Sequence, residues 1–419
     1  MLSLIFSRAR AHPLRRRPRH DVAMSKTSSK GRVLYLVMDG DFARRQGVPS
    51  SNRNHFAIFG SRYTQVFDQV HIMCRVHDVE DERTLPVGGR GVDVIALPPV
   101  HGWRGLLRYG PHIVKAFLDI PRDAVVLLRV PGIYPILAWL ILALRRQPYG
   151  VEAMADADAQ FTPGAYQRRF RSFYRLAWTR MMKLQCRHAA ASSYVTMNAL
   201  QSQFPPGAGR PSFSYTTLDL PEQALVRRPR SRSSFEKPEL ILVNVAMMQK
   251  HLKGQDLIIR AVARLVQSGL RTKLWLVGDG DTRGEFERLA AELGVAEHVE
   301  FLGRVQAGAE VFALLDQADI FVLPSRQEGL PRVVIEAMAR ALPCFASALP
   351  GNHELLDAPF LVRVNDEEDW VLKLRDALRR ADFLAQASQA NLAAARRFTV
   401  GRIQPIRNRF YETLSACSA

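Results

Sequence analysis

The chain has 419 residues, of which 47% are apolar and 23% are charged. Both fractions are ordinary for a protein that buries cores, so disordered, collagen-like and disulfide-scaffold proteins are excluded as descriptions of the whole chain. Lysine and arginine outnumber aspartate and glutamate by 58 to 40, which gives a formal net charge of +18. This charge favours an anionic partner, such as nucleic acid, an acidic membrane face or a phosphorylated small molecule.

The four cysteines, Cys74, Cys186, Cys344 and Cys417, share no CxxC spacing and form no zinc-type cluster with histidine. We therefore predict no metal site and a reducing compartment. No window reaches the ~18 uncharged apolar residues of a transmembrane helix. The apolar run at 133–144 predicts a buried helix, with an interfacial segment as the alternative.

Residues 1–30 contain eight lysines and arginines and a single acidic residue, Asp21. A segment rich in arginine and poor in acids is typical of a transit peptide. The alternatives are a disordered basic tail, or an over-extended start with Met24 as the true initiator. We predict a basic, disordered tail here.

From residue 32 onward, short apolar runs alternate with amphipathic stretches, which is typical of a parallel sheet covered on both faces. The predicted strands are residues 33–37, 94–97, 124–128, 192–196, 240–245, 273–277, 299–302 and 320–323. Charge, serine and proline interrupt the pattern at 222–237. We predict an α/β protein with two Rossmann-like domains, 31–221 and 238–395, which are joined by a linker at 222–237 and face each other across a cleft. A helical segment at 396–419 is expected to pack back on the first domain.

Positive charge is concentrated at residues 101–210, with 15 basic and 5 acidic residues, a surplus of +10. Within 165–188, aromatic and methionine side chains recur at helical spacing among arginines. One interpretation is a helix that binds an anionic membrane surface. The other is an ordinary surface helix whose apolar stripe, including Phe173, Tyr174 and Leu184, packs into the core.

The most informative stretch is residues 321–354. A strand ends at Pro324, and a helix is predicted from Arg332 to Ala339, with Pro331 in its first turn. Backbone N–H groups that precede such a helix lie at the positive end of its dipole and form an anion site. Glu328 precedes the helix and Glu336 lies one turn inside it. Carboxylates beside an anion site are suited to accept hydrogen bonds from sugar or ribose hydroxyls near a phosphate.

The spacing Glu328-x7-Glu336, within PSRQEGLPRVVIEAMARALP, resembles the signature of retaining family 4 glycosyltransferases of the GT-B fold. Residues 242–262 resemble that family's donor-diphosphate loop, and residues 274–305 resemble its VGxG turn and the strand that faces the nucleobase. The resemblance implies a retaining, metal-independent hexosyltransferase. Its donor would be a nucleotide-diphosphate sugar of UDP or GDP type, and no separate cofactor is expected.

The same resemblance assigns roles to individual residues. Glu336 would bind the ribose and Glu328 the transferred sugar, while Lys253 would neutralise the β-phosphate as it leaves. The expected phosphate ligands are the backbone N–H groups of Gly329, Leu330 and Arg332. Further donor contacts are expected from Gly47, Lys250, Gly278, Arg304 and Val305. Asp156 is a third catalytic candidate, which would orient the sugar or acceptor; the alternative is a loop aspartate that caps a helix.

Three positions depart from the family pattern. Met248 stands where an arginine is usual, so either Lys250 is the substitute or the loop carries an insertion. Ala341 replaces the glycine that follows the helix, and Pro350-Gly351 replaces a Gly-Gly pair. These departures predict a reshaped sugar pocket.

The expected acceptor is a glycan or a lipid-linked acceptor at the cytoplasmic face of the plasma membrane, which would make the protein cytoplasmic or peripherally bound. A GT-B relative that epimerises or hydrolyses nucleotide sugars without an acceptor is the second interpretation. A third, a nucleic-acid-binding protein, rests on charge alone, since the sequence has no RRM, KH, helix-turn-helix or zinc signature. We expect no nucleic acid partner.

Overall fold

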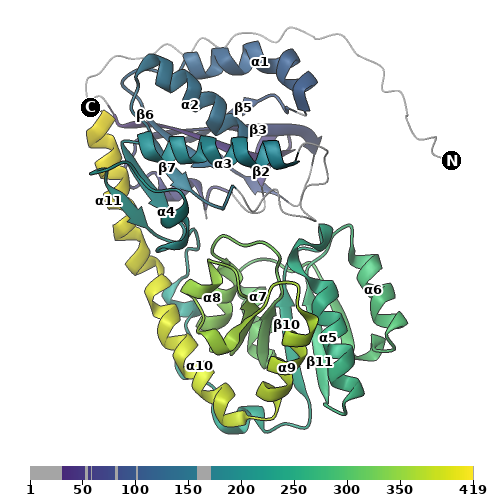
Figure 1. Ribbon diagram of the computed structural model, residues 1–419. Coiled ribbons are helices and arrows are strands. Elements are labelled where there is room, and N and C mark those ends of the chain that lie inside the picture. The colour runs from purple at the N-terminus through teal and green to yellow at the C-terminus, as the bar shows by residue number, and fades with distance from the viewer. Residues whose placement is uncertain are drawn as a thin grey trace, which may run out of the picture. The chain divides into compact units, whose positions relative to one another are not determined.

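The computed structural model describes residues 31–51, 55–57, 59–80, 84–100, 102–157 and 171–418. The predicted basic tail and the first residues of the basic segment, up to 170, lie outside the described residues. The described chain forms an α/β structure with two sheets, one of nine strands and one of six (Figure 1). This confirms the predicted fold class.

The nine-stranded sheet has the order β4-β2-β1-β6-β7-β8-β9, with β3 paired to β1 and β5 paired to β3. Its strands are β1 (Val33–Arg45), β2 (Val48–Ser51), β3 (Gln69–Glu80), β4 (Leu85–Pro86), β5 (Val92–Leu97), β6 (Val125–Val130), β7 (Gly150–Ala153), β8 (Ala191–Tyr194) and β9 (Ser212–Ser214). β1 pairs in parallel with β3 and β6, whereas β2 and β4 add an antiparallel extension.

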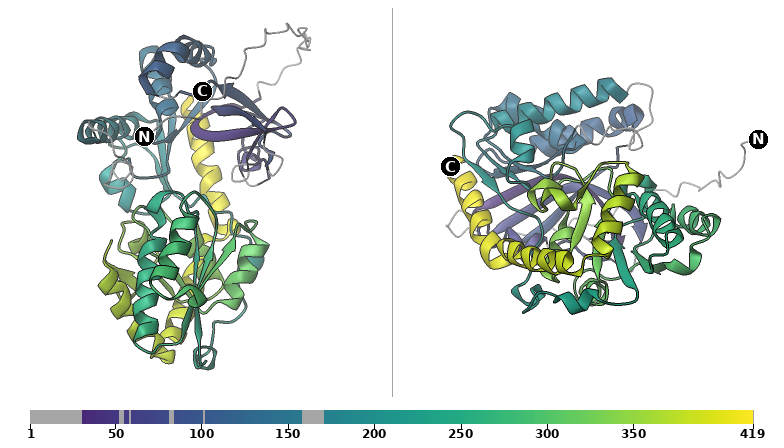
Figure 2. Two further views of the ribbon diagram at one scale, coloured as in Figure 1. Left: turned by 90° about the vertical axis from the view of Figure 1, so that its right-hand side faces the viewer. Right: turned by 60° about the horizontal axis from the view of Figure 1, so that its bottom comes forward.

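Helices cover both faces of this sheet. One face packs against α1 (Gly102–Leu118), α2 (Ile133–Arg145), α3 (Arg171–His188) and the short α4 (Ala199–Gln203). The opposite face packs against the region around the 3-10 helix η1 (Gly60–Arg62) and against α11 (Val400–Ser418). In Figure 2, α11, in yellow, runs beside the purple and teal strands in both views. The last helix therefore returns to the N-terminal sheet, as predicted.

Two of the differences between this sheet and the sequence-based expectation concern β1 and β3. β1 continues to Arg45 and turns back at Gln46 and Gly47, both with positive φ, into β2. β3 is absent from the predicted strands because polar residues such as His71 and Arg75 interrupt its apolar pattern. Pairing with β1 on one side and β5 on the other thus outweighs local composition.

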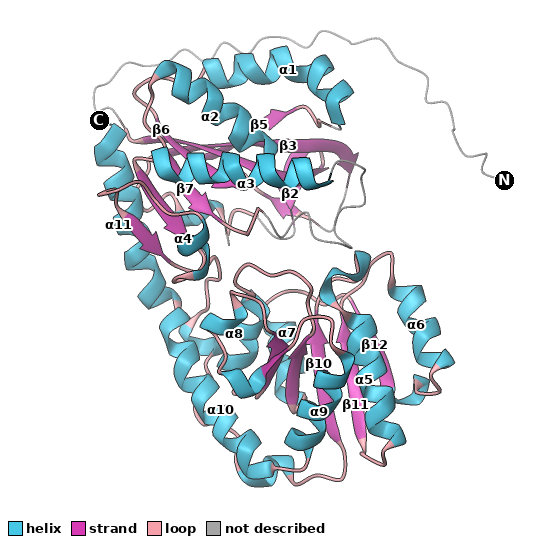
Figure 3. Cartoon of the chain, viewed as in Figure 1, coloured by secondary structure: helices cyan, strands magenta, loops and turns pink. Residues whose placement is uncertain are grey.

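The six-stranded sheet is entirely parallel and has the order β12-β11-β10-β13-β14-β15. Its strands are β10 (Leu240–Val245), β11 (Thr272–Val277), β12 (Val299–Gly303), β13 (Ile320–Leu323), β14 (Cys344–Ser347) and β15 (Leu361–Val362). Helices α5 (Gln255–Gln267), α6 (Arg283–Glu292) and α9 (Glu367–Leu378) pack on one face, whereas α7 (Ala309–Gln317) and α8 (Arg332–Ala339) pack on the other (Figure 3). α10 (Ala381–Ala395) leads to α11 through a short 3-10 turn.

The stretch 222–237, expected as a linker, lies against the C-terminal sheet. It contains two short 3-10 helices, η3 (Glu222–Ala224) and η4 (Arg232–Phe235), and Phe235 enters the core beside β10. The Arg230 guanidinium donates to the backbone carbonyl of Leu315 at 2.9 Å and also to that of Ala318. The segment is therefore fastened to the second domain.

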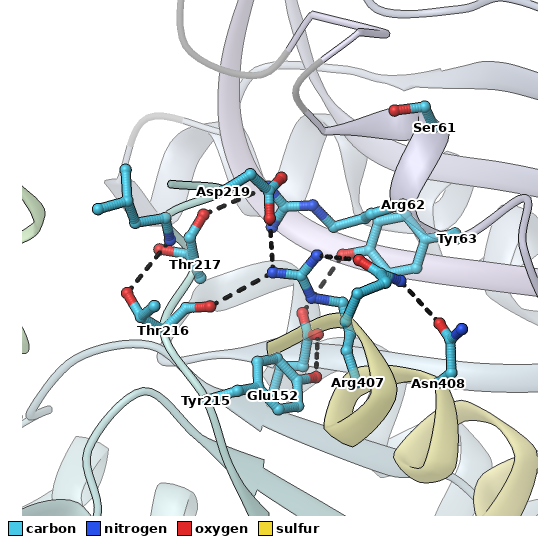
Figure 4. Close-up of polar contacts among 12 residues, drawn as sticks. Ser61, Arg62, Tyr63, Glu152, Tyr215, Thr216, Thr217, Asp219, Arg407 and Asn408 are labelled. Carbon is cyan, nitrogen blue, oxygen red and sulfur yellow. Dashed lines mark hydrogen bonds and ion pairs between the residues drawn. The ribbon is translucent and has the colours of Figure 1, made fainter. Parts of the chain in front are cut away.

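A buried polar network attaches α11 to the N-terminal sheet (Figure 4). Arg407, fully buried on α11, donates to Asp219 at 2.7 Å, and Arg62 donates to the other oxygen of Asp219 at 2.8 Å. Next to this pair, Glu152 of β7 accepts hydrogen bonds from the hydroxyls of Tyr215 at 2.8 Å and of Tyr411, also on α11, at 3.3 Å. Polar groups from four separate parts of the chain thus pair with one another in this buried network.

The helix expected at 133–144 is α2, which buries one face and leaves Leu144 86% exposed. No helix among the described residues is long and apolar enough to cross a membrane. Of the two interpretations of α3, the one with a buried stripe through Phe173, Tyr174 and Leu184 is wrong, because these three side chains are exposed. Met182 and Cys186 are buried instead, since the helix is rotated to place them on the sheet.

Candidate donor site

The predicted donor residues of the C-terminal domain follow the ends of four adjacent parallel strands. Lys250 and Lys253 come after β10, Gly278 after β11, Arg304 and Val305 after β12, and Glu328 after β13. Because β12, β11, β10 and β13 are neighbours in that order, their carboxyl ends share one edge of the sheet. This edge is where parallel α/β sheets bind ligands.

The two residues assigned the central roles are in direct contact. Lys253 Nζ lies 2.6 Å from Glu328 Oε1, and the Ser325 hydroxyl donates to the same oxygen at 2.7 Å. The side chain of Glu328 is 10% exposed and that of Lys253 is 31% exposed. The carboxylate is therefore held on one oxygen, next to a cation that remains accessible. Within the described residues, no group of three or more His, Cys, Asp or Glu could hold a metal ion.

Helix α8 begins at Arg332 and ends at Ala339, as predicted. Pro331 is its N-cap, one residue earlier than the first-turn position expected from the sequence, because its ψ of 109° is extended. The N–H groups that precede the helix lie at the positive end of the dipole. Burial raises the pKa of Glu336 to about 7, although the charge of Arg332 opposes the shift.

The raised pKa of Glu336 predicts a loss of stability as pH rises. In the unfolded chain this carboxyl ionises near its ordinary 4.5, whereas in the folded chain it stays protonated up to about 7. The free energy of unfolding should fall across this window by roughly 2–3 kcal/mol and stay low above it. Urea unfolding at pH 5 and pH 8 should show a smaller difference for Glu336→Gln than for wild type. An exposed control, Glu300→Gln, should behave as wild type; an equal difference in all three proteins would contradict the prediction.

A glycine is required at position 278 because the ends of β10 and β11 approach each other closely there. Its φ is +138°, and a side chain there would collide with the carbonyl oxygen of Ala246 at the end of β10. Its N–H donates to the carbonyl oxygen of Gly303 at 2.7 Å. Gly278 therefore ties the ends of three strands together at the edge of the site.

Replacing Gly278 by alanine should destabilise the protein by about 2 kcal/mol, because the new Cβ has no room and φ is unsuitable. Gly284, in the first turn of α6, is the matched control, since a Cβ added there would have no other atom within 4 Å. Gly284→Ala should be neutral or stabilise by up to about 1 kcal/mol. Thermal unfolding of both variants tests this; equal melting temperatures would refute the close-approach argument.

The structure locates the three positions at which the sequence departs from the family pattern. Met248 is fully buried in the core, so its side chain is not a replacement for a phosphate-binding arginine. Lys250 is exposed and has a φ of 52° at the start of the turn η5 (Lys250–Lys253). Ala341 keeps a left-handed φ of 56° after α8, where glycine would fit more easily. Gly351 lies so close to the Gly329 carbonyl oxygen that a side chain would not fit.

Two predicted residues belong to the other sheet. Gly47 lies in the turn between β1 and β2, where its carbonyl oxygen accepts a hydrogen bond from Arg44 at 3.0 Å. Asp156 follows β7, and its carboxylate accepts a hydrogen bond from Gln203 of α4 at 3.0 Å. The roles of both residues in donor or acceptor binding stay predictions.

Sequence reasoning missed three residues that surround the Lys253–Glu328 pair. They are Ser325, described above, and the ion pair of Arg326 with Asp256, which joins the two loops of the site. Their signal in the sequence is weak, since a serine and an arginine in a loop are common. The partners Arg326 and Asp256 are 70 residues apart, and only the pairing of β10 with β13 brings them together.

The fold is that of the GT-B glycosyltransferases. Sucrose-phosphate synthase from Thermosynechococcus elongatus superimposes with a TM-score of 0.69 over 92% of this chain and 99% of that one, at 17% identity. Anabaena Alr3699/HepE, solved in complex with UDP, gives a TM-score of 0.64 over 92% and 100% of the two chains, at 16% identity. Residues 239–380, which contain the whole Lys253–Glu336 site, match the family Glycosyl transferases group 1. The C-terminal domain thus matches this glycosyltransferase group, and the chain has the fold of the GT-B glycosyltransferases.

Sequence relatives cover different shares of the chain. Protein CapJ of Staphylococcus aureus is 24% identical over 335 residues, which are 79% of this chain and 82% of CapJ. The Vi polysaccharide biosynthesis protein VipC/TviE of Salmonella typhi is 33% identical over 147 residues, 33% of this chain and 25% of that protein. The similarity thus spans most of CapJ but only a quarter of VipC/TviE.

Proposed function

We propose that the protein transfers a hexose from a nucleotide-diphosphate sugar to a glycan acceptor, with retention of anomeric configuration and without a metal ion. The observation that supports this most is the contact between Lys253 and Glu328 beside the start of α8. A cation, a helix N-terminus and a sugar-binding carboxylate meet at one point. The UDP in the HepE complex makes UDP the first donor class to test.

The residues suit the charge that develops during transfer. The bond between the anomeric carbon and the β-phosphate oxygen breaks, a bond to the acceptor oxygen forms, and the acceptor proton passes to the departing phosphate. Lys253 and the N–H groups of Gly329, Leu330 and Arg332 would stabilise that phosphate, a role that otherwise requires a divalent ion. Glu328 would hold the sugar and Glu336 the ribose.

The test is the anomeric configuration of the product. The protein is incubated in EDTA with UDP- and GDP-sugars and a panel of glycan acceptors, and each product is examined by proton NMR. We expect one donor class to give a glycoside with the configuration of the donor. An inverted product, or activity abolished by EDTA, would overturn the mechanism. Free or epimerised sugar formed without acceptor would instead support the second enzyme interpretation.

We further propose that the acceptor lies at an anionic membrane surface, to which α3 binds. Phe173 is 68% exposed and Leu176 is 61% exposed, and both lie on a helix that also presents Arg180 and Lys183 to solvent. Exposed apolar side chains beside cations are the features of an interfacial helix. Leu144 of the neighbouring α2 adds another exposed apolar side chain. A peripheral location at the cytoplasmic membrane face follows from this proposal.

Reversing charges on α3 should weaken membrane binding. Each basic residue near an anionic leaflet contributes about 1 kcal/mol, so Arg180→Glu with Lys183→Glu should weaken binding about tenfold or more. The assay is co-sedimentation with phosphatidylcholine vesicles, with and without phosphatidylglycerol, at low and high salt. Arg271→Glu with Arg288→Glu, exposed positions on the C-terminal domain, is the control. If vesicle binding changed neither with salt nor in the α3 variant, α3 would be excluded as the membrane-binding surface.

A further inference from the structure

The Lys253–Glu328 contact joins two loops that are far apart in sequence. Lys253 ends the turn η5, which follows β10, and Glu328 lies in the loop after β13. The two strands are parallel neighbours in the sheet, so both loops leave it side by side. Sheet pairing fixes the starting points of the two loops. The positions of Lys253 and Glu328 further along the loops must be fixed by additional contacts.

Arg326 makes those contacts. Its backbone N–H donates to the Leu252 carbonyl oxygen at 2.8 Å, and its guanidinium donates to the His251 carbonyl oxygen. The same guanidinium donates two parallel hydrogen bonds to Asp256, at 2.8 and 2.7 Å. Residues on both sides of Lys253 are therefore bound to a residue that lies two positions before Glu328.

This arrangement is geometrically rigid. A bidentate arginine–carboxylate pair fixes both distance and orientation, because the fork of the guanidinium is planar. The remaining Nε donates to Asn365 Oδ1 at 2.7 Å, and the side chains of Arg326 and Asp256 are only 18% and 21% exposed. Burial would raise the pKa of Asp256, but the hydrogen bonds and charge of Arg326 outweigh it and lower that pKa. The pair thus stays ionised near neutral pH.

We propose that Arg326, clamped to Asp256, is a positioning residue that holds Lys253 at the β-phosphate and sets its separation from Glu328. The proposal rests on the proposed function, since it presumes that Lys253 meets a diphosphate. It adds a residue pair that would act through Lys253 and not directly on the phosphate or the sugar. Loss of the clamp should weaken contacts with the β-phosphate and leave contacts with the nucleoside and α-phosphate unchanged.

The test compares the affinities of UDP and UMP, measured by calorimetry, or of GDP and GMP if wild type prefers guanosine. In Arg326→Gln the ratio of diphosphate to monophosphate affinity should fall about tenfold, because small displacements of a positioned group have large effects. UMP affinity should stay within about twofold of wild type. Arg326→Lys keeps the charge but loses the two parallel hydrogen bonds of the guanidinium, and it should lower the ratio, as should Asp256→Asn. These two variants replace Arg326→Gln in the test if that variant does not fold.

A double-mutant comparison shows whether the effect passes through Lys253. In the Lys253→Met background, Arg326→Gln should change the UDP-to-UMP ratio less than about twofold, because the positioned cation is already gone. The matched control is another bidentate pair of the same domain, Arg340 with Asp316, at 2.7 and 2.5 Å. Arg340→Gln should leave the ratio unchanged.

Three results would overturn the clamp: an unchanged ratio in the Arg326 and Asp256 variants, equal losses of UDP and UMP affinity, or effects of Arg326→Gln and Lys253→Met that multiply. Failure of the proposed function looks different. In that case folded wild type binds neither UDP nor GDP, and no ratio can be formed, which also removes the basis of the clamp.

Discussion

Replacing Lys253 by methionine should lower the turnover number by about 10²–10³-fold, which corresponds to about 2.7–4 kcal/mol of transition-state stabilisation. The lysine is the side chain assigned to the charge on the departing β-phosphate, and it lies 2.6 Å from Glu328. Methionine keeps much of the length and removes the charge. Release of nucleoside diphosphate from the donor sugar that wild type accepts is the measurement.

The control for this variant is Lys273→Met. Lys273 lies near the amino end of β11, at the opposite edge of the sheet, and forms a surface pair with Glu239 at 3.4 Å. Its loss should leave turnover within about twofold, since exposed ion pairs contribute little. If Lys253→Met were as active as Lys273→Met, the assignment of the leaving-group cation would be wrong.

Replacing Glu152 by glutamine should lower the free energy of unfolding by about 3–5 kcal/mol, the range seen when one partner of a buried ion pair is removed. Glu152 lies 3.1 Å from Arg129 Nε, and both side chains are under a tenth exposed. Burial and the charge of Glu152 raise the pKa of Tyr215, so this tyrosine remains a hydrogen-bond donor. Glutamine would leave the Arg129 charge without a counter-ion.

The measurement is urea unfolding followed by tryptophan fluorescence at neutral pH. Glu236→Gln is the matched control, because Glu236 pairs with Arg232 at 2.6 Å on the surface. Both of those side chains are about half exposed or more, so the control should change stability far less than Glu152→Gln does. Equal midpoints for the two variants would show that the network in Figure 4 contributes no more than a surface pair.

Local sequence patterns are sufficient for much of the donor domain. The bounds of β10, β13 and α8 agree with those predicted, because each is a short apolar run or an amphipathic turn with clear ends. The proximity of Lys253 and Glu328 follows from the family resemblance and from the rule that parallel strands end at one edge. These features are predictable because each depends on a single strand, the loop that follows it and the next helix.

The remaining features depend on contacts between distant segments. The pair of Arg326 with Asp256 and the network around Glu152 join residues whose neighbours in sequence give no sign of a partner. The interpretation of α3 as a helix that buries Phe173 also failed. Apolar residues occur on more than one side of this helix, so the sequence does not show which side is buried. Which side is buried depends on the sheet below it, and the sheet selects Met182 rather than Phe173.

The most direct test of the donor site is calorimetric binding of UDP, GDP and ADP in EDTA to wild type and to Glu336→Ala. Glu336 is the carboxylate assigned to the ribose, and losing its two hydrogen bonds should cost about 1.5–3 kcal/mol, or roughly 10- to 150-fold in affinity. We predict that wild type prefers one diphosphate and that the variant binds it more weakly by this factor. Folded wild type that binds none of the three would contradict the assigned roles of Glu328, Glu336 and Lys253, and a variant that binds as tightly as wild type would contradict that of Glu336.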